Sequence, residues 1–456
     1  MSTARMQGGP RARWPLFLAL GTLVASWGCA TAGPPVLGPR DVPALERRAL
    51  AEPNNGRAHL ELAAALAASG RCYDALAAAD RGRRLEPADP LGPLVTGKCL
   101  EDAGLPGHAL EIYTSFLSQY GNVPGAAAVE GRRAIALQAH AKELVRAAIQ
   151  EEEVLGPADP ETVGVLPFVV AGDSVYQPLS VGLAHMLTTD LALLGRFPLV
   201  ERIRLGAVLE ELALAPEMVD PSTAVRSGRL VGAARLVLGT VSIPPSLEAR
   251  LGGNVVLETG EVVEPGLTEG ELRELLELQK DYSVRVAEAL GYGLTEAERR
   301  RMDENRPANL RALLAFSRGL MAEDAGDFAG AAAHFREALS ADPQYGEAQE
   351  RYRSAVGADV VSRTAPGEIV QVVSRVDQAL GLVPEAPAPS QVSPPPAPGL
   401  LQSTLGGAVF DVASHQSERS LVDAGSATPA ASVTPSENQI VPPLEAILTI
   451  IITIPR

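Results

Sequence analysis

The sequence is poor in aromatic residues, in cysteine and in basic side chains. Aromatic residues make up 4% of the 456 residues, and the chain has three cysteines. Lys and Arg number 39 against 55 Asp and Glu, so the formal net charge is −16. Binding to a nucleic-acid backbone needs clustered cationic side chains. The composition therefore argues against nucleic acid as a partner.

Common signatures of catalysis and cofactor binding are missing as well. The sequence contains no glycine-rich phosphate loop ending in Lys and Ser or Thr, no G-x-S-x-G, no H-E-x-x-H and no C-x-x-C. The histidines are scattered, and none is spaced to bind a metal together with a cysteine. We expect no catalytic residue, no cofactor and no metal site. His185 shows no partner in the sequence, and we interpret it as a structural residue.

The first 28 residues resemble a bacterial export signal. Arginines precede an apolar run at residues 16–25, which is too short to span a membrane. The run ends at Ser26-Trp27-Gly28-Cys29, which resembles a lipobox. This resemblance implies a lipid on Cys29, and Ala30 behind it implies an outer membrane lipoprotein facing the periplasm. An ordinary cleaved signal with an unmodified cysteine is the alternative.

Two different patterns follow the signal. Residues 29–55 contain several Gly-Pro and Pro-Pro pairs with little periodicity, and we expect a flexible linker there. Residues 56–157 are helical in pattern and resemble tetratricopeptide repeats. The resemblance implies that Gly70 and Gly104 end the first helix of each repeat in a left-handed conformation. Alanine-rich helical hairpins without that identity are the alternative.

The two remaining cysteines fall in neighbouring expected helices. Cys72 begins the second helix of one repeat, and Cys99 lies in the first helix of the next. A disulfide between them and a pair of buried free thiols both fit the sequence, because spacing does not determine the Cα separation that a disulfide requires.

Residues 160–295 alternate between strand and helix patterns, which is typical of a small sheet covered by helices. Asp220 before Pro221 has the pattern of a helix N-cap. We expect strands at residues 163–170, 198–201 and 235–242 and two weaker ones within 247–263, and helices at residues 179–194, 203–212, 221–231 and 269–290.

Specific phrases in this region resemble the periplasmic domain of the CsgG family. They include Val165-Leu166-Pro167-Phe168, Arg196-Phe197 with Val200-Glu201-Arg202, and Leu238-Gly239-Thr240-Val241. This domain type is shared with TolB-amino-terminal-like and FlgO-like proteins and with LpoB, a lipoprotein activator of peptidoglycan synthases. The resemblance covers residues 163–290 and implies a role in assembly. At Glu201-Arg202 we expect an ion pair or a contact to another subunit.

A further helical repeat and a biased tail complete the chain. Residues 305–356 resemble one more tetratricopeptide repeat, which must dock on the α/β domain, on the N-terminal helices or on a partner. Residues 357–456 are expected to form a low-complexity tail, in which the composition shifts at about Thr364 toward a Pro-rich, disordered segment. The alternating apolar pattern at 448–454 predicts a strand that adds to a sheet edge. Removing residues 444–456 should then change solubility or oligomeric state.

Together these features predict a multidomain α and α+β protein, in which helical hairpins flank a small three-layered α/β domain and a disordered tail follows. We expect a non-catalytic envelope lipoprotein that serves as a scaffold in secretion or outer-membrane assembly. Its partners are proteins, bound through the helical repeats and the CsgG-like domain, and the membrane, bound through the lipid on Cys29. An LpoB-like regulator of a peptidoglycan synthase is the alternative. The sequence does not determine the partner, and a homo-oligomer stays open.

Overall fold

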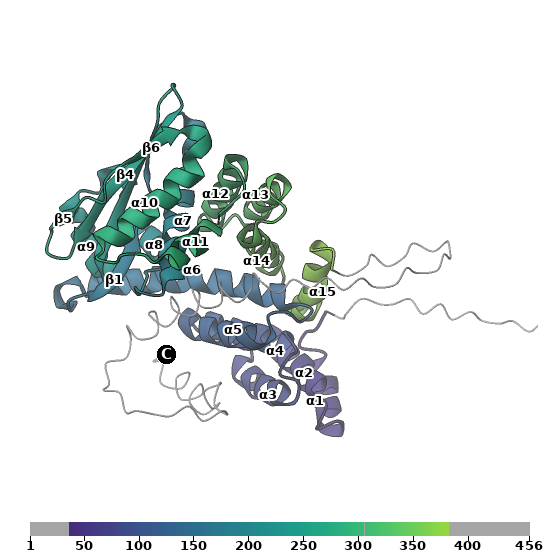
Figure 1. Ribbon diagram of the computed structural model, residues 1–456. Helices are drawn as coiled ribbons and strands as arrows, with labels where there is room; N and C mark the ends of the chain where they lie inside the picture. Colours follow the sequence, from purple (N-terminus) through teal and green to yellow (C-terminus); the bar gives the residue numbers. More distant parts are fainter. Residues whose placement is uncertain (1–35, 305, 383–456) are drawn as a thin grey trace, which may run out of the picture. The chain divides into compact units, whose positions relative to one another are not determined.

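A computed structural model describes residues 36–304 and 306–382 (Figure 1). The export signal, Cys29 and the strand pattern at 448–454 lie outside the described residues. In the described ranges, helical hairpins flank one six-stranded mixed sheet covered by helices, which confirms the predicted fold class. No helix in these ranges is long and apolar enough to cross a membrane.

Antiparallel helices make up the chain before the sheet. The predicted turn glycines, Gly70 and Gly104, both adopt a left-handed conformation with φ of 74°. Glycine is needed there because a side chain disfavours positive φ. The helices are α1 (Val42–Ala51), α2 (Gly56–Ala68), α3 (Cys72–Leu85), α4 (Leu91–Asp102), α5 (Pro106–Tyr120) and α6 (Ala126–Gln150).

Helix α1 corrects the prediction of a flexible linker at residues 29–55, which is wrong for residues 42–51. Pro43 stands in the first turn of the helix, where a proline without an N–H group is tolerated. Val42 and Ala49 are buried, and α1 packs on α2. The Gly-Pro and Pro-Pro pairs that suggested a tether lie before this helix, at residues 33–39.

The sheet follows α6. Strands β1 and β2 run parallel to β3, β3 pairs antiparallel with β4, and β4 pairs antiparallel with both β5 and β6. The strands are β1 (Asp159–Val165), β2 (Val169–Gly172), β3 (Ala233–Ile243), β4 (Glu248–Leu257), β5 (Val262–Val263) and β6 (Thr268–Glu271). The helices around them are α7 (Leu179–Leu194), α8 (Arg202–Glu211), α9 (Pro221–Val231), α10 (Leu275–Ala289) and α11 (Glu296–Glu304).

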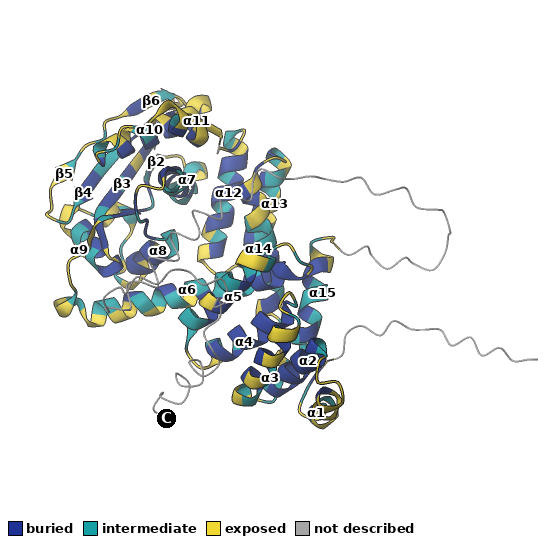
Figure 2. Cartoon of the chain, turned by 60° about the horizontal axis from the view of Figure 1, so that its bottom comes forward, coloured by how far each residue is buried: buried dark blue, intermediate teal, exposed yellow. Residues whose placement is uncertain are grey.

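Helices cover both faces of this sheet, so the domain has three layers. Side chains alternate along a strand, and neighbouring residues of β3 accordingly belong to different cores. Val237 and Val241 pack with α7 and α10, whereas Leu236 packs with α8 and α9. Figure 2 shows the central strands β3 and β4 as largely buried.

Three predicted elements of the α/β domain need correction. The run at 163–170 is two strands, because Pro167 between them has no N–H group to donate to β3. Residues 198–201 form no strand, and Leu199 makes a single bridge to Val163. The helix predicted at 269–290 begins only at Leu275, because the preceding residues form β6 and a turn.

Other local predictions are confirmed. Helix α7 ends at Gly195 with φ of 60°. The Asp220 carboxylate caps α9 by accepting a hydrogen bond of 2.8 Å from the backbone N–H of Thr223. Gly232 ends that helix with φ of 73°.

The C-terminal helices repeat the N-terminal design. Gly97 on α4 and Gly319 on α12 each lie against the aromatic ring, Tyr113 or Phe335, that follows at the same sequence spacing on the next helix. The turn residue Gly326 again has φ of 74°. The helices are α12 (Leu310–Asp324), α13 (Phe328–Ala341), α14 (Gly346–Ser362) and α15 (Ile369–Ala379).

This C-terminal region docks on two of the three surfaces that the sequence left open. Helix α12 packs on α7 of the α/β domain, and α14 packs along α6. At the second contact, Gly131 and Gly357 face the backbone of the opposite helix so closely that a methyl group on either would overlap it. The α/β domain is thus an insertion between helices that contact each other.

The prediction of a disordered tail from residue 357 is wrong for residues 357–382. Helix α14 continues to Ser362, and α15 follows after the turn η5 (Pro366–Glu368). Val370, Val372 and Val376 of α15 are buried among the N-terminal helices. Composition misled the prediction because a short amphipathic helix lies directly before the Pro-rich segment.

Candidate functional site

A buried polar junction joins the α/β domain to the C-terminal helices. His185 on α7 contacts the carboxylate of Glu347 on α14, and both side chains are buried. The imidazole ring also lies 5.6 Å from the ring of Phe316 on α12. His185 therefore has a structural partner that local sequence could not reveal, because Glu347 follows 162 positions later.

A second buried pair fixes α10 against α7. The Lys280 ammonium lies 2.5 Å from the Asp190 carboxylate, whose exposed fraction is 0%. Gln279 and Ser283 donate further hydrogen bonds of 2.9 and 2.7 Å to the same carboxylate. Burial raises the pKa of Asp190, and the ammonium and these hydrogen bonds oppose that rise. A buried carboxylate with three donors suits a fixed contact between helices.

The two pairs act on each other electrostatically. Burial opposes ionisation of Glu347, but nearby His185, Arg351 and Lys280 outweigh it and lower the pKa of this carboxyl group. For Tyr345, burial and the charge of Glu347 both raise the pKa well above its ordinary value. The junction therefore holds Glu347 as an anion and keeps the neighbouring phenol neutral.

The predicted motif Val200-Glu201-Arg202 also serves this junction. Arg202, at the start of α8, forms an ion pair with Asp324 at the end of α12. It lies 3.6 Å from Glu323, which in turn is 3.1 Å from Arg351 of α14. The ion pair expected at this motif therefore lies within the chain and links the α/β domain to the C-terminal helices.

The neighbouring Arg196-Phe197 secures the connection that leaves the α/β domain. The ring of Phe197 packs edge-to-face on Tyr292, with centroids 4.5 Å apart. Arg196 donates to Glu298 at 3.2 Å. Hydrogen bonds from Thr295, together with Arg196, lower the pKa of Glu298 to about 2. Thr295 and Glu298 form a reciprocal capping box that begins α11.

A surface cleft of about 590 Å³ lies where β2 and β3 end. Val175 and Leu247 are its exposed apolar side chains, with exposed fractions of 46% and 50%. Asp173 is the one carboxylate in the lining, and it accepts a hydrogen bond from the backbone N–H of Val175. Such a lining suits an apolar side chain of another protein better than a reacting substrate. The lining residues are Ala171, Gly172, Asp173, Val175, Tyr176, Ser242, Ile243, Pro244, Pro245 and Leu247.

The predicted site residues are cysteines. Cys72 and Cys99 form a disulfide between α3 and α4, with their Cα atoms 5.4 Å apart. Cys29, the predicted lipidation site, lies outside the described residues. Within residues 36–304 and 306–382, His, Cys, Asp and Glu side chains form no cluster of three or more that could bind a metal ion.

Residues 162–304, from within β1 to the end of α11, match the protein family described as curli production assembly/transport component CsgG. The chain contains a CsgG-family domain. This CsgG-family domain includes α11, which the predicted boundary at residue 295 left out. No curated protein matches the chain.

The sequence reasoning missed the buried polar residues that fix helices within the CsgG-family domain and that attach this domain to the C-terminal helices. The available signal was a polar residue on a helix face that is otherwise buried. Such positions are held by Asp190, Lys280 and Glu347. A polar residue on a buried face requires a partner. Its identity depends on packing between elements that are distant in the sequence.

Proposed function

We propose that this protein is a non-catalytic assembly component of the bacterial envelope. The observation that carries the proposal is the CsgG-family domain at residues 162–304, whose family is described by assembly and transport in curli production. Arg202 and Phe197, from the motifs of this domain, are engaged in an ion pair and an aromatic contact. Both contacts lie within the chain.

The proposed location is the periplasmic side of the outer membrane, with a lipid on Cys29 as the anchor. Support comes from the lipobox-like Ser26-Trp27-Gly28-Cys29 and from Ala30. The Cys72–Cys99 disulfide suits an oxidising compartment. Growth with an alkyne-labelled fatty acid should label the protein, and Cys29→Ser should remove the label while Cys72→Ser retains it. Equal labelling of all three would contradict lipidation at Cys29.

The helical regions are proposed to be tetratricopeptide repeats that bind protein partners. Support comes from the left-handed turn glycines and from the matching Gly97–Tyr113 and Gly319–Phe335 contacts. We propose repeats at residues 56–157 and 305–356 on either side of the α/β domain that begins at residue 160.

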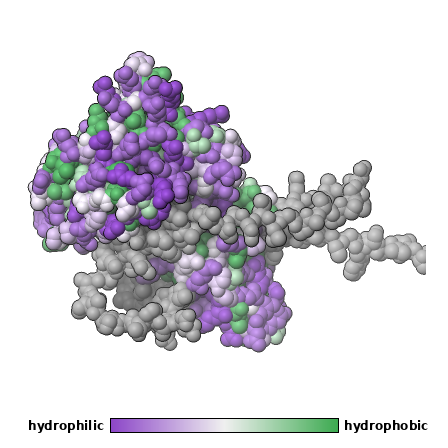
Figure 3. Space-filling model, in the orientation of Figure 1, coloured by the Kyte–Doolittle hydropathy of each residue, from purple (hydrophilic) through white to green (hydrophobic). Residues whose placement is uncertain are grey.

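The apolar cleft is a suitable place to test contact with a partner or a second copy. Figure 3 shows hydrophobic residues scattered over a mostly hydrophilic face of the α/β domain, so one broad apolar patch does not stand out on that face. A photo-crosslinking amino acid at Val175 in the cleft should give a discrete crosslinked species in intact cells. Met218, which lies in the same domain but outside the cleft lining, is a matched control, because its exposed fraction of 53% is close to the 46% of Val175.

Mass spectrometry of the crosslinked species separates the functions. Envelope assembly proteins or a second copy of the chain would support the proposal. Enrichment of peptidoglycan synthases would favour the LpoB-like regulator instead. Monomer alone at both positions, with no recurring partner, would contradict a scaffold role.

A further inference from the structure

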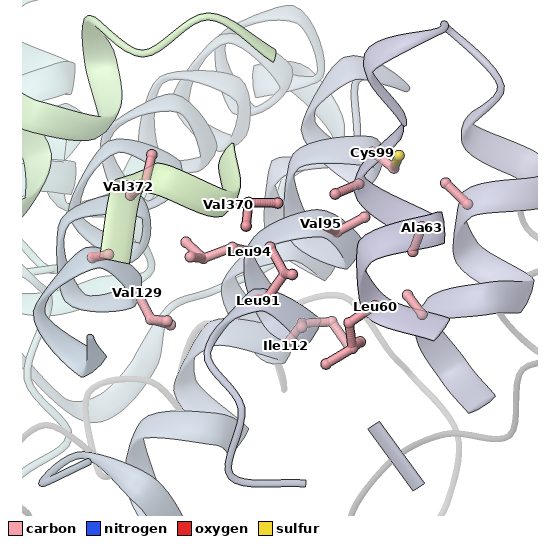
Figure 4. Packing of buried hydrophobic residues seen from close by; sticks show 14 of the residues in the cluster. Leu60, Ala63, Leu91, Leu94, Val95, Cys99, Ile112, Val129, Val370 and Val372 are labelled. Carbon is pink, nitrogen blue, oxygen red and sulfur yellow. The ribbon is translucent and has the colours of Figure 1, made fainter. Parts of the chain in front are cut away.

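The N-terminal helices share a surface that another part of the chain covers. Helix α2 contacts α4, and α4 contacts α6, while α15 lies against all three and η5 lies against α2. Figure 4 shows Val370 of α15 beside Leu94 and Val95 of α4. The same buried cluster includes Val372 and Val376 of α15 and Val129 of α6.

Helix α15 is amphipathic, and its apolar side makes this contact. Val370, Val372 and Val376 have exposed fractions of at most 4%. Gln378 is exposed on the other side of the helix. The surface shared by α2, α4 and α6 therefore holds one face of an amphipathic helix, as helix-binding grooves do.

One carboxylate adds a specific polar contact. Asp377 is buried, and its Oδ1 atom accepts a hydrogen bond of 3.1 Å from the backbone N–H of Gly125, which directly precedes α6. Gly125 has φ of 82°, and a side chain at this position would overlap Val373. The backbone N–H groups and dipole at the start of α6 favour a negative charge. The surface thus recognises an apolar stripe followed by an acidic residue.

The length and composition of α15 indicate that its helix depends on this surface. It has 11 residues, and an isolated helix of that length is marginal in water. Four of the residues are valines, which have a low helix propensity. Pro366 and Gly367 separate it from α14. It also contacts α14, but that longer helix ends at Ser362, before this turn.

We infer that the surface formed by α2, α4 and α6 is a binding site for an amphipathic helix of a partner protein, and that α15 occupies it within the chain until the partner displaces it. The partner helix presents apolar residues at the spacing of Val370, Val372 and Val376, followed by a carboxylate in place of Asp377. A short tether holds a segment at an effective concentration in the millimolar range. The partner helix must therefore bind the surface tightly enough to displace α15 at that effective concentration. The inference deepens the proposed scaffold role and rests on it for the existence of a partner.

Hydrogen exchange of the unmodified protein gives the first test. Helix α15 should exchange at least tenfold faster than α4, because it detaches while the N-terminal helices stay folded. Equal protection of α15 and α4 would overturn the inference, since α15 would then be an inseparable part of the core.

Peptide binding to the full-length chain gives the second test. The probe is a fluorescein-labelled peptide of residues 363–382, and binding is followed by anisotropy. The double variant Val372→Asp, Val376→Asp should release α15 and bind the probe at least tenfold more tightly than the unmodified chain. Gln378→Asp adds charge to the exposed side of α15 and should behave like the unmodified chain. A probe carrying the two aspartates should not bind.

A folded variant that fails to bind the probe overturns the inference. Hydrogen exchange of α2 and α4 reports whether the variant is folded, and the milder Val372→Ala, Val376→Ala replaces it where it is not. If neither variant binds the labelled peptide, the proposed site is likewise refuted. The probe comes from this chain, so such a failure leaves the crosslinking test of the assembly role unaffected.

Discussion

Replacing Lys280 by methionine tests whether the buried pair with Asp190 holds α10 against α7. Methionine keeps an unbranched side chain but removes the ammonium that lies 2.5 Å from the carboxylate. Removing one partner of a buried ion pair typically costs about 3–5 kcal/mol. Gln279 and Ser283 still donate to Asp190, so we expect the low end, about 3 kcal/mol, at pH 8.

The cost should depend on pH in a defined direction. Burial already raises the pKa of Asp190 above its ordinary 3.8, and the loss of Lys280 removes the main opposing charge. In the variant, the folded protein therefore takes up a proton at Asp190 as the pH falls, before the unfolded chain does. Since this uptake favours the folded state, the destabilisation should be greatest at pH 8 and should shrink toward acidic pH.

Hydrogen exchange read by mass spectrometry at α7 and α10 is the suitable assay, because a chain with several domains does not unfold in one step. A loss of 3 kcal/mol corresponds to exchange about 150-fold faster at pH 8. Arg285→Met on the exposed side of α10 is the control and should change little. Adding Asp190→Asn to Lys280→Met removes both charges and should restore most protection. Exchange within threefold of the unmodified protein for Lys280→Met would refute the reasoning.

Three further changes test other contacts. Gly357→Ala should destabilise the α6–α14 contact by about 1–3 kcal/mol, read by hydrogen exchange of α6 and α14, because the new methyl overlaps the α6 backbone. Gly346→Ala, with open space around it, should not, and equal effects would contradict this packing. Replacing Cys72 and Cys99 by serine should cost about 3–4 kcal/mol under oxidising conditions, and the difference from the unmodified protein should vanish in reductant. Glu350 is an exposed residue, but partial desolvation of its carboxyl group and nearby Glu347 raise its pKa from 4.5 to about 7. Its ionisation between these pH values therefore disfavours folding. Glu350→Gln should therefore raise the melting temperature at pH 8 and have no effect near pH 4.5. Solvent screening limits the gain in stability to below about 1 kcal/mol. A gain at pH 4.5 alone would contradict the predicted pH dependence.

Local sequence signals predicted helix ends and turns well where the residues that carry the signal also form the structural feature. The turn glycine Gly70, the cap Asp220 and the stop at Gly195 are such cases. Each depends on backbone sterics or on one hydrogen bond within a helical turn. The same kind of reasoning should have divided the strand at Pro167, because proline cannot donate to a central strand.

Contacts between distant elements could not be predicted in this way. An apolar or polar pattern indicates that a face is buried, but not which element covers it. The hydrogen bond between Gly125 and Asp377 joins residues 252 positions apart, and the His185–Glu347 contact joins residues 162 apart. The junction between the α/β domain and the C-terminal helices consists of such contacts. The sequence therefore predicted the helices and strands better than the contacts that join them.

The insertion of the α/β domain between α6 and α14 has a consequence for the order of folding. During synthesis the N-terminal end emerges first, so α6 becomes available long before Gly357 arrives to cover Gly131. Until then one side of α6 lacks its native cover, and contacts of such long sequence separation form slowly. A chaperone that protects exposed apolar helices would act during this interval. Completion of the helical array thus waits for the last described helices of the chain.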